Sequence, residues 1–168
     1  MEAKYIGFPP AVHGDYYIGV QRIENITEEM REIHALHFQE TETLYLDEPF
    51  NPDYGRYIDA ERRNGFVLFT VRHNSTLVGY LQYYVYRDMH ASGMFTAKED
   101  AFFLLPEHRG QGLAPKVLDF AEDFLQKLGC RYVGMSDKSP IGGVALGGFL
   151  KHRGYRDVAV YYVKELES

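Results

Sequence analysis

Two glycines, Gly110 and Gly112, stand between a short apolar run and the start of a helical pattern. Residues 102–105 are continuously apolar, which is typical of a strand covered on both faces. Pro106 has no amide hydrogen and ends that strand. The glycines let the backbone turn tightly and present its N–H groups without Cβ atoms in the way. Because N–H groups at the start of a helix carry partial positive charge, these residues predict a binding site for a phosphate or pyrophosphate.

Two better-known phosphate loops do not fit this turn. The Walker loop ends in Gly-Lys-Ser/Thr, which the sequence lacks. The dinucleotide-binding fingerprint has three glycines after the first strand of a βαβ unit, whereas this turn has two, in an Arg-x-x-Gly-x-Ala frame past the middle of the chain. The alternative interpretation is an ordinary strand-to-helix connection in which the glycines serve only the turn.

Residues 104–114, LLPEHRGQGLA, closely resemble the acetyl-CoA-binding motif of the GCN5-related N-acetyltransferase superfamily. That motif is written Gln/Arg-x-x-Gly-x-Gly/Ala, and Arg109, Gly112 and Ala114 occupy its three defined positions. The order of the expected helices and strands also fits, so the resemblance spans most of the chain. Within the superfamily the sequence is most similar to members encoded in bacteriophage genomes.

The resemblance implies acetyl-CoA as the cosubstrate and assigns its binding residues. The backbone of Phe102 and Leu104 is expected to bind pantetheine, with the acetyl carbonyl near Phe102. The pyrophosphate is expected to lie on the backbone amides of Arg109, Gly110, Gln111, Gly112, Leu113 and Ala114. Several preorganised N–H donors at a helix start can share two anionic groups, so the physical argument supports the same assignment.

Acetyl transfer to an amine requires a neutral amine, so a base or a water chain must remove its proton. Asp100 lies two residues before Phe102, which predicts that both side chains share one sheet face, and it aligns with an acidic position common in the family. We predict Asp100 as the base, directly or through water, with Glu99 as its substitute. The alternative for Asp100 is a solubilising charge at a strand edge. Tyr84 and Tyr86 share one face of the neighbouring strand and either line the acceptor groove or only pack there.

The sequence departs from the family at the group that reprotonates the departing thiolate. The usual pattern near the last helix is Phe-Tyr-x-x-x-Gly-Phe, but residues 149–155 read FLKHRGY, so Leu150 occupies the tyrosine position. Leucine has no proton to donate. The alternative proton donors are Ser139, Tyr155 and Tyr162, and of these Tyr162 is our candidate. Because a thiol has a pKa near 8.5, departure assisted only by water is also compatible with catalysis.

The fold that the resemblance implies is α/β (α+β): a mixed, strongly twisted sheet of about six to seven strands with helices on both faces. In that fold the strand before the glycine turn splays from its neighbour, and pantetheine lies in the gap. Alternating or apolar runs predict strands at 16–23, 66–72, 76–86, 102–105, 131–136 and 158–166. Helical spacing predicts helices at 27–40, 53–64, 112–128 and 144–153. Residues 1–15 read as an extended arm, and we expect 1–168 to form a single domain.

Composition narrows the class of protein. A net charge of −6 disfavours a nucleic-acid binder, which usually carries a basic patch. The single cysteine, Cys130, allows no intrachain disulfide and no cysteine-rich metal site, and we expect it to be buried. The N-terminus lacks the apolar core of a signal peptide, and no apolar run is long enough to cross a bilayer. We therefore expect a cytoplasmic protein without a metal or a membrane partner.

Together these observations predict an N-acetyltransferase that moves an acetyl group from acetyl-CoA directly to a primary amine of a small molecule or a protein. The alternative is an acetyl-CoA-binding or host-interaction module with little or no turnover, which Leu150 favours. The sequence does not identify the acceptor, and it does not decide between a monomer and a homodimer.

Overall fold

The computed structural model describes residues 7–138, 145–164 and 166, and its strands form one six-stranded sheet in the order β1-β2-β3-β4-β5-β6. Neighbouring strands are antiparallel except for β5 and β6, which are parallel. The sheet is therefore mixed, as the sequence predicts. The strands span Ala11–His13 (β1), Tyr16–Gln21 (β2), Phe66–His73 (β3), Thr76–Arg87 (β4), Phe95–Leu104 (β5) and Cys130–Gly134 (β6).

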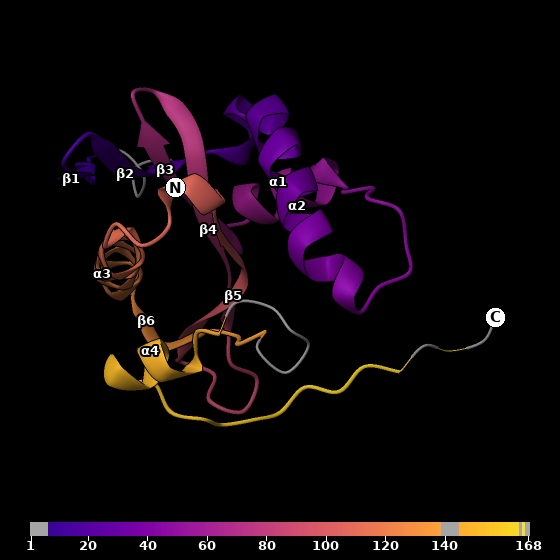
Figure 1. Cartoon of the computed structure of the whole chain (residues 1–168). Coiled ribbons are helices and arrows are strands. Elements are labelled where there is room, and N and C mark those ends of the chain that lie inside the picture. The colour runs from indigo at the N-terminus through magenta and orange to yellow at the C-terminus, as the bar shows by residue number, and fades with distance from the viewer. Residues whose placement is uncertain (1–6, 139–144, 165, 167–168) are drawn as a thin grey trace. The chain divides into compact units, whose positions relative to one another are not determined.

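The α-helices lie close to their predicted positions. In the described part of the chain they span Thr27–Thr41 (α1), Tyr54–Arg62 (α2), Leu113–Lys127 (α3) and Gly147–His152 (α4), with 3-10 turns at Ile23–Asn25, Glu42–Leu44 and Pro106–His108. The first half of α1 and the whole of α2 cover one face of the sheet, and α3 covers the other (Figure 1). The prediction of helices on both faces is confirmed.

Each face of the sheet buries its own apolar cluster. On the α1 and α2 side, Met30 and Ile33 pack with Phe66, Tyr80 and Phe103. On the α3 side, the ring of Phe69 meets Phe120 and Phe124 edge-on, with centroids 6.0 and 5.5 Å apart. Because side chains alternate along a strand, the neighbouring residues Leu68 and Phe69 of β3 serve opposite clusters.

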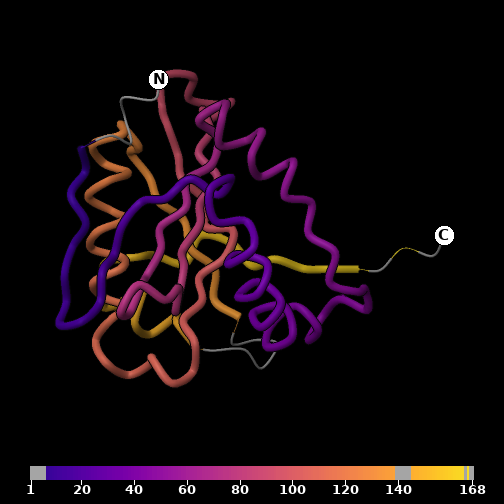
Figure 2. The backbone as a smooth tube through the Cα atoms, turned by 90° about the horizontal axis from the view of Figure 1, so that it is seen from above, coloured from indigo at the N-terminus to yellow at the C-terminus, as the bar shows by residue number. Residues whose placement is uncertain are grey.

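The chain before β2 runs along α3, as the two segments side by side in Figure 2 show. Phe8 packs edge-on against Phe120 and Phe124, with ring centroids 5.1 and 5.0 Å away. Within the range expected as an arm, Ala11–His13 form the short strand β1, which pairs with β2. This segment therefore adds an edge strand beside β2 and packs against α3.

The chain divides into two compact units, one formed by Met1–His34 with Asn51–Met135 and the other by Ala35–Phe50 with Ser136–Ser168. The first unit contains the whole sheet, α2 and α3. In the second unit, Lys138 lies 4.9 Å above the ring of Tyr45, and the carboxylate of Asp137 accepts from the backbone N–H of Leu146 and Gly147 at 3.1 Å each.

One predicted strand is wrong. Residues 158–164 and 166 form no strand, and the side chains of Val158 and Tyr161 are each 87% exposed. The alternation of β-branched and aromatic residues favours a strand, but strand propensity does not supply the partner that a ladder needs. Ser139, one of the alternative proton donors, lies outside the described residues.

Gly79 allows a close approach between β4 and β5. A Cβ atom at this position would lie 2.9 Å from the carbonyl oxygen of Phe103 and would collide with Leu104. The β3–β4 register also shifts beside it, between Val71 and Arg72. The missing side chain therefore lets β4 hold the last two residues of β5, just before the glycine turn.

Candidate active site

The turn between β5 and α3 presents the start of the helix without a capping side chain. Gly110 and Gly112 have φ angles of +74° and +70°, in the left-handed region that favours glycine. Gly112 is the N-cap residue of α3, and no side chain accepts from the first-turn amides. Residues 110–112 are exposed. The turn therefore has the geometry of a candidate anion site at the start of α3, and anion binding there stays a prediction.

Side chains from β1 and β2 brace this turn, and sequence reasoning missed them. The buried hydroxyl of Tyr16 donates to Gln111 Oε1 at 3.0 Å and lies 2.9 Å from Nδ1 of His108, whose N–H it can accept. His13 Nε2 lies 3.3 Å from the carbonyl oxygen of Gln111. These partners are more than 90 residues apart in sequence, so no local pattern could reveal them.

Arg109 ties the turn back to the end of β5. Its Nε donates to the carbonyl oxygen of Leu104 at 2.8 Å, and its guanidinium lies 5.3 Å from the ring centroid of Phe103. A guanidinium is always charged, so this contact places a fixed positive charge where β5 meets the turn. That charge would assist an anion bound at the candidate site.

The edge of β5 opens before the turn. Its ladder with β6 extends only from Phe95 to Lys98, which pairs with Gly134. On the other edge, Leu105 donates to the carbonyl of Val78 at 2.9 Å. Because antiparallel pairing alternates, the backbone groups of Phe102 and Leu104 then point away from β4 and toward the open edge. These outward backbone groups have no partner from β6 in the ladder, which ends at Lys98.

Asp100 lies where β5 separates from β6, but not on the predicted face. The β4–β5 register shifts there: Ala101 is opposite Gln82, and Glu99 is opposite Tyr83. Asp100 is the extra residue of a β-bulge, which breaks the alternation on which the prediction depended. Asp100 therefore faces α2 together with Ala101, whereas Phe102, opposite Leu81, faces α3.

Tyrosines surround the half-buried carboxylate of Asp100. Tyr57 OH donates to Asp100 Oδ2 at 3.2 Å, and the rings of Tyr57 and Tyr84 stack at 6.5 Å with an interplanar angle of 12°. Burial, and then the negative charge of Asp100, raise the pKa of Tyr57 and of Tyr84 above the ordinary value. Both phenols thus keep their protons at neutral pH. Tyr84 and Tyr86, which share a face, are 39% and 44% exposed, so this surface is open to a ligand.

The other predicted catalytic residues are Glu99 and Tyr162. Glu99 pairs with Tyr83, so its side chain points to the face opposite Asp100. Tyr162 belongs to the second unit and is 85% exposed. Leu150 is buried in α4, and its carbonyl accepts from the N–H of the half-buried Tyr155 at 3.0 Å.

Two further side chains near Asp100 were missed by sequence reasoning. Gln82 donates from Nε2 to Asp100 Oδ2 at 2.6 Å, and its Oε1 lies 3.2 Å from His34 Nε2. The sequence signal is Gln82 itself, the one amide side chain in its strand. In the structure Gln82 is 1% exposed. Such a buried amide implies partners, although the sequence does not say which.

His34 makes folding stability depend on pH. Burial lowers its pKa from 6.5 to about 4, among the rings of Tyr54 and Tyr57 from α2 and Tyr80 from β4. The unfolded chain takes up the proton near pH 6.5 and the folded chain only near pH 4, so the free energy of unfolding falls as pH falls between these values. The shift corresponds to about 3 kcal/mol.

We therefore expect the His34→Gln variant to lose less stability than the wild type between pH 7 and pH 4, by about 3 kcal/mol. Urea denaturation at several pH values measures this difference. The exposed His152 provides the matched control, and His152→Gln should follow the wild-type curve. Parallel curves for His34→Gln and the wild type would contradict the burial of a neutral His34.

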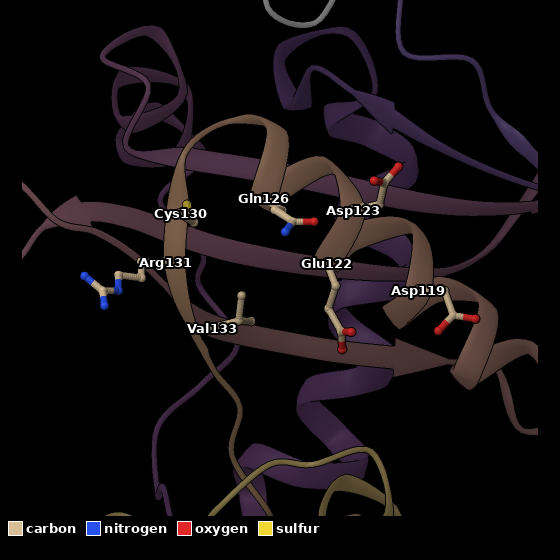
Figure 3. Close-up of a pocket in the computed structure, with 7 residues that line it drawn as sticks. All are labelled: Asp119, Glu122, Asp123, Gln126, Cys130, Arg131 and Val133. Carbon is tan, nitrogen blue, oxygen red and sulfur yellow. The ribbon is translucent and has the colours of Figure 1, made fainter.

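A separate open groove of about 400 Å³ lies between α3 and β6 (Figure 3). Asp119, Glu122 and Asp123 line its α3 side, and Arg131 is its one basic lining residue. Cys130, which the sequence predicts as buried, is partly exposed there. Three carboxylates disfavour a phosphate, so the glycine turn remains the candidate anion site.

No group of three or more His, Cys, Asp or Glu side chains within residues 7–138, 145–164 and 166 is placed to hold a metal ion. In the same part of the chain, no helix combines the length and the apolar character that a bilayer crossing needs.

Comparison with known proteins matches the model of the acetyltransferase (GNAT) family to residues 27–155. No curated protein matches the sequence. Among solved structures, an aminoglycoside acetyltransferase, meta-AAC0020, from an uncultured soil metagenomic sample has a TM-score of 0.69 at 15% identity, covering 94% of this chain and 100% of that one. The ribosomal-protein-alanine N-acetyltransferase from Brucella melitensis biovar Abortus 2308 has a TM-score of 0.63 at 16% identity, covering 91% and 99%. The glucosamine-6-phosphate N-acetyltransferase from Arabidopsis thaliana has a TM-score of 0.65 at 13% identity, covering 90% and 99%. At these identities the likeness shows the fold.

Proposed function

Since this chain belongs to the GNAT acetyltransferase family, we propose that it transfers the acetyl group of acetyl-CoA directly to a primary amine of a small molecule or a protein. The observation that carries the proposal is the position of Asp100. It lies at the bulge where β5 leaves β6, two residues before the open edge at Phe102. A carboxylate therefore adjoins the gap in which an acetyl thioester would lie.

The donor half of the proposed site consists of backbone groups. The amides of residues 109–114 receive the pyrophosphate, and the charge of Arg109 assists them. The outward N–H and C=O groups of Phe102 and the outward N–H of Leu104, whose carbonyl already accepts from Arg109, receive pantetheine. Preorganised donors of this kind need no rearrangement on binding, because β1, β2 and Arg109 already hold the turn.

The chemical step needs one proton acceptor and one leaving group. The amine nitrogen attacks the acetyl carbonyl carbon, a C–N bond forms, and the C–S bond of the thioester breaks. Asp100 takes the proton that the amine loses, directly or through water. The CoA thiolate leaves with the electron pair of the C–S bond and takes its proton from water or from a tyrosine, for which Tyr162 is the candidate.

The surroundings of Asp100 favour a cationic acceptor. An amine in neutral water is an ammonium ion, and the Asp100 carboxylate attracts it. The stacked faces of Tyr57 and Tyr84 add a cation–π surface beside the carboxylate. The similar structures are named for an aminoglycoside, a ribosomal-protein alanine and glucosamine 6-phosphate, all of which carry amines. We propose an amine acceptor for this chain on the same grounds. We also propose that the protein acts in the cytoplasm, and its sequence is compatible with a homodimer.

One observation favours a second candidate, an acetyl-CoA-binding or host-interaction module with little turnover. The family's usual tyrosine position holds Leu150, whose buried side chain has no proton to donate. The two candidates differ in turnover and agree in binding.

Calorimetry with acetyl-CoA, followed by a thiol-release assay over a panel of amines, separates these candidates. We expect a saturable heat of binding and thiol release that depends on the added amine. Binding without transfer to any amine would support the module, and the absence of binding would refute both.

A further inference from the structure

A chain of hydrogen bonds leads from α2 through α1 and β4 to Asp100 on β5. Tyr54 OH lies 3.0 Å from His34 Nδ1, and His34 Nε2 lies 3.2 Å from Gln82 Oε1. Gln82 Nε2 then donates to Asp100 Oδ2 at 2.6 Å. Tyr54, His34 and Gln82 are 6%, 7% and 1% exposed, so water competes little for these contacts.

The direction of every hydrogen bond in this chain follows from the carboxylate. An ionised carboxylate only accepts, so Gln82 must turn its NH2 group toward Asp100. Its carbonyl oxygen then faces His34 Nε2, which must carry a hydrogen. In a neutral imidazole the other nitrogen, Nδ1, is then an acceptor and accepts the hydrogen bond that Tyr54 OH donates. Each polar atom of the chain has one role, and reversing any member would leave two donors or two acceptors facing each other.

The protonation states of His34 and Tyr54 support the same hydrogen-bond direction, from Tyr54 toward Asp100. Burial lowers the pKa of His34 to about 4, so the imidazole is neutral at neutral pH. Burial raises the pKa of Tyr54 to about 12, so the phenol keeps the proton it donates. The rings that face His34 are Tyr54 and Tyr57 from α2 and Tyr80 from β4, and the guanidinium of Arg31 lies 5.0 Å above the ring of Tyr54.

We propose that Gln82 and His34 are positioning residues for acetyl transfer, holding the Asp100 carboxylate at the edge where β5 leaves β6. Gln82 and Tyr57 both donate to the same oxygen, Oδ2, which fixes the orientation of the carboxylate. Burying a series of polar groups costs free energy unless each group has a hydrogen-bond partner, whereas an apolar side chain at position 82 would need none. This inference rests on the proposed role of Asp100 as the base.

A double-mutant cycle tests the positioning role. Gln82→Met keeps the length of the side chain but removes both amide functions. We expect it to lower kcat about tenfold or more, with the Kd for acetyl-CoA unchanged, and to have little further effect in an Asp100→Asn background. His34→Leu should act like Gln82→Met, and His34→Gln, which keeps an N–H donor, should recover much of the loss. An equal loss in both backgrounds, or an unchanged kcat, would overturn the proposal.

A second readout needs no acetyl transfer. The ¹⁵N NMR shifts of a neutral imidazole distinguish the nitrogen that carries hydrogen, and we expect His34 in the Nε2–H form across neutral pH. An Nδ1–H form or an imidazolium would overturn the hydrogen-bond chain even in an active enzyme. The Nε2–H form in a protein that acetylates no amine would instead refute the proposed function, and the positioning role with it. The thermal unfolding midpoint of Gln82→Met shows whether a kinetic loss reflects unfolding.

Discussion

Replacing Asp100 with asparagine should lower kcat/KM for the amine by about 10²–10⁴-fold, the usual contribution of a general base. Asparagine still offers an oxygen to Gln82 and Tyr57, so the hydrogen-bond frame is kept and only the proton acceptor is lost. The Kd for acetyl-CoA should not change, because the donor half of the site lies on the backbone of β5 and the turn. Steady-state kinetics and calorimetry on the same variant measure both quantities.

Two other carboxylates sharpen this experiment. Asp123 is exposed, forms an ion pair with Lys127 on α3 and should tolerate replacement by asparagine with unchanged kinetics. Glu99 faces the opposite side of the sheet from Asp100. If Glu99→Gln proved as damaging as Asp100→Asn, the assignment of the base to the α2 face would fail.

The second large effect is expected at the turn. Gly112→Val places a branched side chain at the N-cap of α3, where it covers amides that would contact pyrophosphate. Hydrogen bonds to a charged group contribute about 1.5–3 kcal/mol each. The loss of one such contact should therefore raise the Kd for acetyl-CoA by about ten- to a hundredfold, which calorimetry measures.

Backbone strain has to be separated from lost contacts in that variant. Valine at φ +70° is strained wherever it occurs, so the control needs a similar angle far from the site. Gly129 has φ +96° and open space around it, at the other end of α3. Gly129→Val should cost similar stability and leave the Kd unchanged. Equal effects of the two substitutions on the Kd would show that the turn is only structural.

The glycine turn of the proposed donor site could be predicted from the sequence because its signals are local. Pro106, Gly110 and Gly112 each constrain the backbone by their own chemistry, and the structure gives the two glycines the left-handed angles that a tight turn requires. The helix after the turn also follows local periodicity, and its bounds were predicted to within one residue. The strand before the turn was predicted at 102–105, but β5 begins at Phe95, because residues 96–100 are mostly polar and lack an apolar strand pattern.

The face of Asp100 could not be predicted in this way. Alternation along a strand assigns it to the side of Phe102, but one extra residue reverses that assignment. The register shift depends on how β4 and β5 pair, which is a property of two strands and not of either sequence alone. The lone Gln82 opposite Ala101 marks the place only once the pairing is known.

The residues that brace the site were missed because they are distant in sequence. His34 and Gln82 are 48 positions apart, and Tyr16 and His108 are 92 apart. Residues 158–164 show the converse case, in which a clear strand pattern has no partner and forms no strand. Residue types within one segment therefore predicted the glycine turn. The residues that brace the proposed site depend on tertiary contacts, which no single segment specifies.

The most direct test of acetyl transfer follows the acetyl group itself. The protein is mixed with acetyl-CoA carrying a ¹³C-labelled carbonyl and with one amine at a time, and NMR records where the label resides. We predict that the label passes from thioester to amide only when an amine is present, and that Asp100→Asn slows this passage. A label that stays on the thioester, or that goes to acetate irrespective of the amine, would contradict the assignment of this chain as an amine acetyltransferase.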